Sequence, residues 1–142
     1  MKTLVAFALS LACAGTAWAQ SPAPAKLVLV DHSVERLIDT KSARAIVVEG
    51  IPARVWKLYP ANKWGWASQV EGGMTGGNIC VVTARVMVAP LSASKKVLFR
   101  PHKMATTFDA IPNANAEQCQ QLARDKLKEA VQGVVSSLVR TG

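Results

Sequence analysis

Aromatic and cationic side chains are interleaved in residues 54–66, whose sequence is RVWKLYPANKWGW. The segment holds three of the four tryptophans, the only tyrosine and three basic residues. Aromatic planes beside cations suit a sugar ring, a membrane interface or the centre of a protein contact. We therefore predict a partner-binding surface whose contact residues are Trp64, Trp66, Tyr59, Lys57 and Lys63. The alternative is that Trp56 fills the core while the other two rings brace a loop against it.

His102 and Met104 form a His-x-Met pair, which offers two soft ligands for Cu(I). Residues i and i+2 of a strand share a face, so both side chains could reach one ion. Met74 and Met87 add sulfur atoms at no recognised spacing, and the sequence lacks the His-Glu-x-x-His, paired Cys-x-x-Cys and dense acidic patterns of other metal sites. We predict no cofactor, with a periplasmic copper-binding protein using His102 and Met104 as the alternative function.

Asp31, His32 and Ser33 supply the three residue types of a Ser-His-Asp triad. Contiguous residues cannot form that relay, because neighbouring side chains on a strand point to opposite faces. No serine lies in a Gly-x-Ser-x-Gly turn. Catalysis would require distant residues, such as a cleft in which Asp31, His32 or Asp109 meets a second titratable group. We predict that the protein is not an enzyme and has no catalytic residues.

Cys80 and Cys119 are the only cysteines after residue 19. In an oxidising compartment such a pair favours one intramolecular disulfide, and two free buried thiols are the alternative. Counted from Cys80 to Cys119, the bridge closes a loop of 40 residues. Closing a loop of that size stabilises a fold by roughly 4 kcal/mol in the chain-entropy model. A bonded cysteine cannot act as a nucleophile.

Residues 1–19 have the pattern of a secretory signal peptide. Lys2 provides the basic start, an apolar run follows from Leu4 to about Ala14, and Ala17-Trp18-Ala19 is a small-x-small cleavage site. The apolar run is shorter than the about 20 residues that span a bilayer. The alternative is a lipoprotein signal with Cys13 as the lipid-bearing cysteine.

Cleavage after residue 19 leaves a disordered Pro/Ala spacer at 20–26 and one domain at 27–142. No later segment is long and apolar enough to cross a bilayer. We therefore predict a periplasmic protein, with peripheral membrane contact as an open option and the oligomeric state undetermined.

The mature chain is basic: without Lys2, sixteen basic residues face nine acidic ones, a net charge of +7. Such a charge favours anionic partners, which outside the cytoplasm are phospholipid headgroups, acidic polymers of the envelope or an acidic protein. Export argues against nucleic acid. The alternative is that the charge only keeps the protein soluble.

Residues 78–89, NICVVTARVMVA, are predicted to form the central strand, because apolar and β-branched residues dominate between Gly77 and Pro90. Alternation places Cys80, Val82, Ala84, Val86 and Val88 on a core face. Similar patterns predict further strands at 27–30, 44–49, 53–59 and 66–71, and one at 95–100 that Pro101 interrupts and that resumes at 104–111. Ser33 is predicted to cap a short helix.

Residues 116–140 carry the clearest helical pattern, an apolar stripe that includes Cys119, Leu122, Leu127 and Val134. Asn115 is the predicted N-cap, with Gln118 three residues later completing a capping box. Gly133 would let the helix approach what it covers.

These elements predict an α+β fold: a mostly antiparallel sheet of five or six strands, a long C-terminal helix on one face and a short N-terminal helix. The predicted function is that of a small exported, disulfide-stapled accessory or binding protein of the bacterial cell envelope. It would contact a protein or an anionic envelope component through the Trp/Lys-rich surface.

Overall fold

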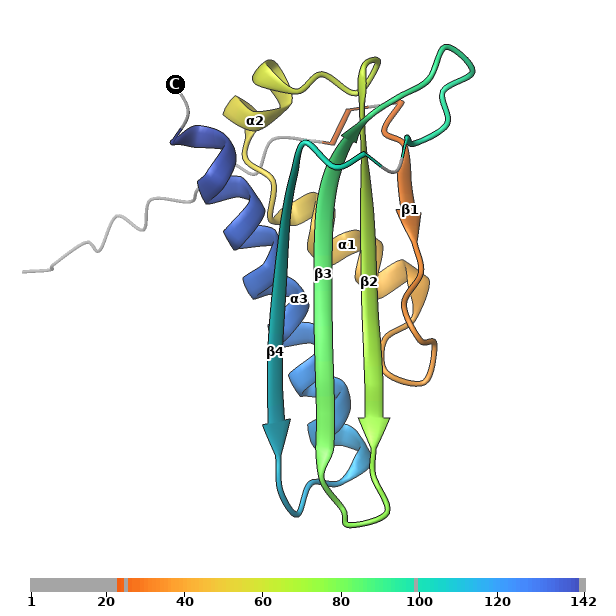
Figure 1. Cartoon of the computed structure of the whole chain (residues 1–142), viewed down its shortest axis with the longest axis vertical. Coiled ribbons are helices and arrows are strands. Elements are labelled where there is room, and N and C mark those ends of the chain that lie inside the picture. The colour runs from red at the N-terminus through yellow and green to blue at the C-terminus, as the bar shows by residue number, and fades with distance from the viewer. Residues whose placement is uncertain (1–22, 25, 99, 141–142) are drawn as a thin grey trace, which may run out of the picture.

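One mixed sheet backed by helices forms the protein, and the computed structural model describes residues 23–24, 26–98 and 100–140. The predicted signal peptide, Cys13 and most of the spacer lie outside these residues. The sheet has four strands in the order β1-β2-β3-β4 (Figure 1). They are β1 Leu29–Asp31, β2 Trp64–Met74, β3 Cys80–Pro90 and β4 Lys103–Ile111. β1 runs parallel to β2, and the other two pairings are antiparallel.

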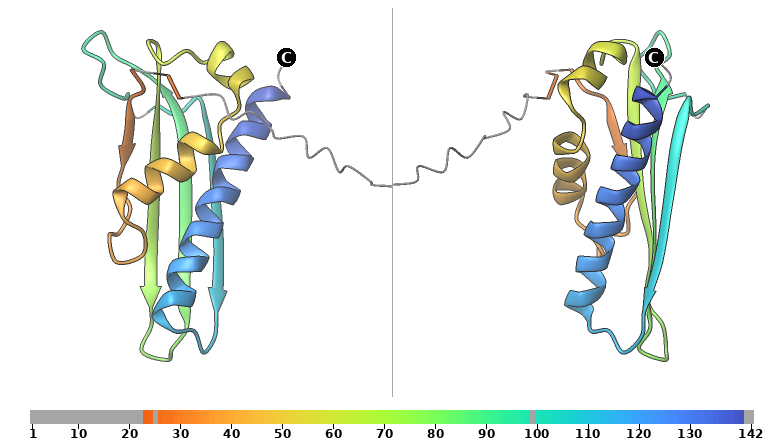
Figure 2. Two further views of the ribbon diagram at one scale, coloured as in Figure 1. Left: turned by 180° about the vertical axis from the view of Figure 1, so that it is seen from behind. Right: turned by 90° about the vertical axis from the view of Figure 1, so that its left-hand side faces the viewer.

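Three helices lie on the same side of this sheet (Figure 2). They are α1 Thr40–Glu49, α2 Ala53–Leu58 and α3 Ala116–Val139. α3 packs along β3 and β4, and α1 packs against α3 and β1. None of the helices in the described residues is long and apolar enough to cross a membrane. The result is a two-layer α+β domain in which the helices of the described residues cover one face of the sheet.

β3 divides its side chains between these two faces as its alternation predicts. Val82, Ala84, Val86 and Val88 are all fully buried against the helices. The intervening residues of β3 before Ala89 are only partly buried and belong to the open face. On neighbouring β4 the open face presents Phe108, whose side chain is 67% exposed. The central strand is therefore confirmed, and among the described residues its other face carries no helix.

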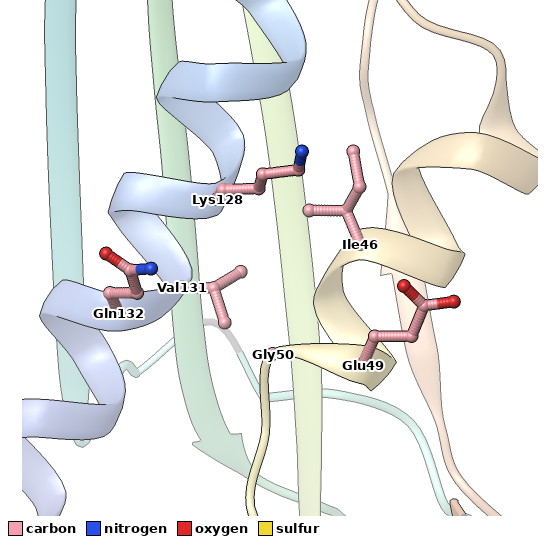
Figure 3. A pocket seen from close by; sticks show the side chains of 6 residues that line it. All are labelled: Ile46, Glu49, Gly50, Lys128, Val131 and Gln132. Carbon is pink, nitrogen blue, oxygen red and sulfur yellow. The ribbon is translucent and has the colours of Figure 1, made fainter. Parts of the chain in front are cut away.

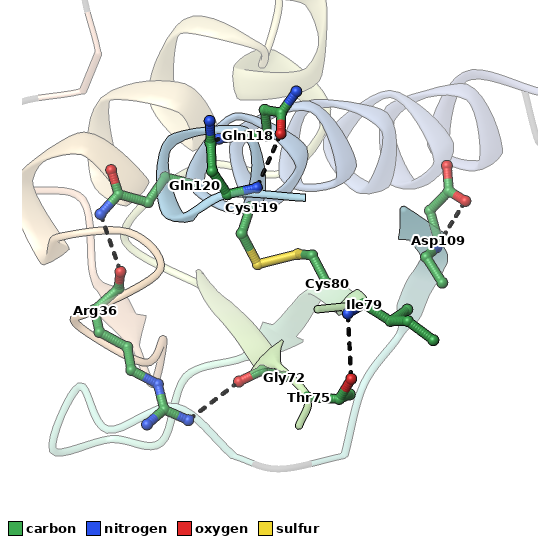
Figure 4. Close-up of a disulfide and its surroundings, with 11 residues drawn as sticks. Arg36, Gly72, Thr75, Ile79, Cys80, Asp109, Gln118, Cys119 and Gln120 are labelled. Atoms are coloured by element: carbon green, nitrogen blue, oxygen red, sulfur yellow. Dashed lines mark hydrogen bonds between the residues drawn. A yellow bond between two sulfur atoms is a disulfide. The ribbon is translucent and has the colours of Figure 1, made fainter. Parts of the chain in front are cut away.

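α3 begins at the predicted capping box. The Asn115 side chain accepts a hydrogen bond from the Gln118 backbone N–H at 2.8 Å, and the Gln118 side chain accepts one from the Asn115 N–H at 2.9 Å. One residue further on, Cys119 forms the predicted disulfide with Cys80, with the two Cα atoms 5.5 Å apart (Figure 4). The bond ties the first turn of α3 to the start of β3, and both cysteines are buried.

The expectation of five or six strands is corrected by the structure, whose described residues form a sheet of four. Residues 44–49 belong to α1, which begins where the Asp39 carboxylate accepts the Ser42 N–H at 2.8 Å. Ala43 and Val47 are one helical turn apart and both fully buried. An apolar run of this length suits a strand or a buried helix equally, and the cap together with packing on α3 selects the helix.

Residues 53–59 form α2 and its C-cap where a strand was expected. Val55 and Trp56 are adjacent and both buried, a pattern that alternation along a strand does not predict. Within the described residues 95–98 and 100, no strand forms where one was expected, and the hairpin there carries an isolated bridge between Leu91 and Val97. Ser33 caps no helix, because its hydroxyl donates to the Asp31 carboxylate at 2.7 Å.

Candidate functional site

Three rings from separate parts of the chain form a cluster at one end of the sheet. Tyr59 and Trp64 meet edge to face with centroids 5.2 Å apart. His102 lies 5.2 Å from Trp64 and 5.5 Å from Tyr59 between ring centroids. The Tyr59 hydroxyl is 3.2 Å from Nε2 of His102 and forms a hydrogen bond with it. The sequence analysis predicted Tyr59 and Trp64 as partner contacts. It named His102 only as a possible Cu(I) ligand in the alternative function.

Each ring of this cluster stands where a regular element begins or ends. Tyr59 is the C-cap of α2, and Trp64 is the first residue of β2. His102 lies in a bend just before β4, held by a hydrogen bond from its backbone N–H to the Val88 carbonyl at 2.9 Å. Tyr59 and Trp64 pack against the core from the helix side and are only partly buried. The cluster therefore borders both core and solvent.

Trp66 is not available as a contact residue, which corrects the predicted surface. Its side chain is fully buried, and it meets Trp56 edge to face with centroids 5.9 Å apart. Because residues two apart on β2 share a face, Trp64 and Trp66 both point to the helix side. Trp64 is the first residue of β2 and is only partly buried, in contact with Tyr59 at the end of α2. Trp56 is buried in the core, as the alternative proposed, but Trp66 lies in the core of β2 and does not brace a loop, while Trp64 remains a candidate contact.

The end of the molecule around this cluster is strongly basic. We define the basic end as residues 52–66 and 88–103, which contain seven Lys and Arg residues and no Asp or Glu. They converge because β2 begins opposite the end of β3, and β4 begins beside it, at the top of Figure 1. The seven cations are Arg54, Lys57, Lys63, Lys95, Lys96, Arg100 and Lys103.

The rest of the described chain is electrically balanced, with nine basic and nine acidic residues. The net charge of +7 therefore comes entirely from the basic end. Six of its seven cations are exposed, Lys103 being partly buried. The ion pairs among the described residues join Lys126 to Asp109 and Glu129, so none involves a cation of the basic end. Positive charge at this end is thus not balanced by ion pairs among the described residues.

Two large apolar side chains project among these cations. Leu58, at the last turn of α2, is 61% exposed, and Leu98, in the connection before β4, is 42% exposed. Lys57 and Lys63, which the sequence placed on the contact surface, are both exposed nearby in the chain. Charged and apolar groups thus share the basic end.

The structure does not bring His102 and Met104 to one face. Met104 lies on the open face and is 51% exposed, whereas the His102 ring packs on residues of the helix side. The bend at His102 breaks the alternation on which the shared ligand pair depended. Nε2 of this histidine is also engaged with Tyr59. Within the described residues, no three His, Cys, Asp or Glu side chains are placed to hold a metal ion.

Asp31, His32 and Ser33 form no relay. Oδ1 of Asp31 accepts hydrogen bonds from the Ser33 and Ser68 hydroxyls at 2.7 and 2.8 Å. Its Oδ2 is buried without a hydrogen-bond partner in the structure. His32 belongs to the other face of the sheet, where it lines an open groove with Lys95 and Lys96. Asp109 pairs with Lys126 at 3.5 Å on the helix side.

Two other hollows lie on the helix layer. One, of about 220 Å³, lies between α1 and α3. Ile46 and Lys128 point toward each other across it (Figure 3). Its charged lining residues are Glu49 and Lys128. The second, of about 230 Å³, lies beside the disulfide and is bordered by Arg36, Gly73 and Met74. Neither brings together groups that suggest chemistry.

Similarity to known proteins is limited to distant structural likeness. No protein-family model matches the sequence, and no curated protein matches it either. Two structures of PelC from Paraburkholderia phytofirmans, dodecamers of the protein and of a point variant, each align with a TM-score of 0.45 and 16% identity. They cover 80% of this chain and 91% and 92% of their own. A Caulobacter crescentus CB15 protein aligns with a TM-score of 0.37 and 15% identity, over 80% of this chain and 88% of its own. We draw no functional conclusion from likeness at this level.

Sequence reasoning missed His102 as a partner of the aromatic residues and missed the charge separation. The contact of His102 with the aromatic residues has no local signal in the sequence, because Tyr59 and His102 are 43 positions apart. The charge separation was visible in the sequence as the absence of Asp and Glu from residues 52–66 and 88–103. Only the strand order, however, brings those two segments together.

Proposed function

We propose that this chain is a small exported, non-enzymatic binding protein of the bacterial cell envelope, and that its basic end docks on an anionic component. The observation that carries the proposal is the convergence of all the net positive charge around the partly exposed Tyr59, Trp64 and His102 cluster. Positive potential concentrated on one surface attracts anionic partners and orients them. Export is supported by the signal-peptide pattern of residues 1–19.

Anionic phospholipid headgroups fit this end better than a purely polar polyanion. Leu58 and Leu98 are exposed among the cations, and Trp64 lies partly exposed at the same end. Apolar and aromatic side chains beside lysines suit a membrane interface, where the rings and alkyl groups enter the headgroup layer and the charges meet phosphates. A soluble polyanion would make no use of the two leucines.

Co-sedimentation with vesicles of phosphatidylglycerol and phosphatidylcholine tests the proposal. The wild-type protein should bind the anionic vesicles, bind pure phosphatidylcholine poorly, and dissociate as salt increases, because salt screens exposed charges. Replacing Lys57 and Lys63 by Gln should weaken binding about thirtyfold, since each lysine near an anionic membrane contributes about 1 kcal/mol.

The matched control replaces Lys41 and Lys128 by Gln, which removes the same charge from exposed positions of the helix layer. This variant should bind anionic vesicles nearly as well as the wild type. Equal loss of binding in both variants would reduce the effect to net charge and refute a specific basic end. Binding to an acidic polysaccharide but not to vesicles would redirect the proposal to a polymer partner.

A further inference from the structure

An open groove of about 420 Å³ lies on the face of the sheet that carries no helix. Its lining residues are Val28, Val30, His32, Lys95, Lys96 and Val97. Val28, Val30 and His32 alternate along the chain with Leu29 and Asp31, which pair with the inward-facing Trp66 and Ser68. Val30 of β1 and Val28, just before this strand, therefore belong to the open side, opposite α1 and α3.

The second wall of the groove is the hairpin that joins β3 to β4, and hydrogen bonds hold it over the sheet. The Leu91 N–H donates to the Lys63 carbonyl at 2.8 Å, and the Ser92 N–H donates to the Lys96 carbonyl at 2.9 Å. The Lys95 ammonium donates to the Asn62 carbonyl at 2.7 Å. The hairpin thus has several anchors both within itself and to the β2 side.

Gly65 makes this arrangement possible. A Cβ atom at residue 65 would lie 2.7 Å from Cδ2 of Leu91 and 2.8 Å from Cγ2 of Val97. Glycine removes that clash and lets the hairpin rest on the sheet beside β1. The groove is therefore a preformed feature of the fold.

The floor of the groove is apolar, and its rim is basic. Three valines give an apolar floor, and two exposed lysines stand beside it. His32 is the remaining lining residue, and no carboxylate borders the groove. A volume of this size lies within the range of small-molecule sites, which are mostly apolar with a few polar groups that fix orientation. The two lysines complement a ligand with an anionic head group, and the three valines complement an alkyl chain on the same ligand.

We propose that this groove binds a single-chain anionic amphiphile, a fatty-acid carboxylate whose chain lies on Val28, Val30 and Val97 and whose head meets Lys95 and Lys96. The proposal does not depend on docking of the basic end to vesicles, because it concerns one soluble molecule in one site.

Titration with sodium decanoate below its micelle concentration tests the groove, followed by two-dimensional NMR of labelled protein. Decanoate should produce saturable shifts at the three lining valines. Decanol, which lacks the charge, should bind about tenfold more weakly, given the modest contribution of exposed ion pairs. Butyrate, which lacks most of the chain, should give no saturable shift at the same concentrations. Shifts that fail to saturate, or equal affinity for decanoate and decanol, would overturn the proposal.

Two sets of variants locate the site. Val30→Trp fills the groove without changing the charge and should abolish decanoate binding while leaving vesicle binding intact. Val81→Trp, also on the open face but on β3, is the control and should bind decanoate like the wild type. Replacement of the exposed Lys95 and Lys96 by Gln should weaken decanoate binding about tenfold and leave decanol binding unchanged. Equal effects of the two tryptophan substitutions would refute the assignment.

Discussion

Trp64 couples the folded core to the candidate contact surface. Its ring packs against the core and also meets Tyr59 and His102, so it cannot be treated as a free surface aromatic. Each favourable aromatic contact contributes about 0.5–1.5 kcal/mol beyond burial. A residue in this position serves stability and recognition together.

Trp64→Ala is therefore expected to lower the free energy of unfolding by about 1–3 kcal/mol, from two lost ring contacts. It should also weaken vesicle binding. Urea denaturation of this variant, of His102→Ala and of the double variant measures the coupling. Strictly additive losses would show that the two rings do not act as a cluster.

Asp39 is the residue whose titration most clearly bears on stability. The hydroxyl of Ser42, and then its backbone N–H, hold the pKa of this carboxyl below its usual value. Their hydrogen bonds are 2.6 and 2.8 Å long. A depressed folded-state pKa means that the contribution is present above the unfolded-state pKa and is lost as the pH falls through the folded one.

Asp39→Ala should therefore lower the melting temperature at neutral pH, because α1 loses its N-cap. The difference from the wild type should shrink as the pH is lowered through the acidic range in which Asp39 becomes protonated. Thermal unfolding at several pH values measures this. Asp39→Asn, which keeps a capping acceptor but cannot ionise, should remove the pH-dependent part, and an undiminished gap at low pH would contradict the assignment.

At the scale of elements, Gly133 lets α3 lie close to β4. A Cβ at this position of α3 would lie 2.9 Å from Cβ of Ala105 on β4. Small residues on both sides let the helix backbone lie near the strand. The expectation that Gly133 serves a close approach is therefore confirmed, and its partner is identified.

Gly133→Ala tests whether helix propensity or the tight contact with Ala105 has the larger effect on stability. Alanine favours an isolated helix by up to about 1 kcal/mol, but overpacking a tight contact costs about 1–3 kcal/mol. We expect a net loss of stability in chemical denaturation. Ala105→Gly in the same chain should restore part of it, whereas a stabilised single variant would mean that the layers separate freely.

At the scale of the whole molecule, the disulfide is a covalent cross-link between the start of β3 and the first turn of α3. It joins residues 39 apart in sequence and is buried at both cysteines. Loops of this length gain roughly 4 kcal/mol from closure in the chain-entropy model, a large share of the about 5–15 kcal/mol typical of a domain.

Replacing Cys80 and Cys119 by Ser should lower the free energy of unfolding by about that amount, roughly 4 kcal/mol. Guanidinium denaturation of the variant against the oxidised wild type measures the loss. The reduced wild type, with both thiols verified by mass, should be destabilised to a similar degree. Identical midpoints for the oxidised and reduced protein would contradict a stabilising bond.

Local signals in the sequence determined much of this protein. The alternation of β3, the capping box of α3 and the pairing of two cysteines each depend on nearby residues or on the absence of other partners. Such signals act whatever the rest of the chain does. The apolar run at 44–49 is different, because its burial against α3 decided between helix and strand.

Only the tertiary structure decided which candidate residues meet solvent and which meet one another. Trp64 and Trp66 share a face of β2, yet Trp66 is fully buried within the strand and Trp64, at its first position, is only partly buried. The seven cations come from two segments that the order of β2, β3 and β4 brings to one end. Sequence composition determined the net charge, but its position is a property of long-range packing, since residues far apart in the chain create one surface only after the strands pair.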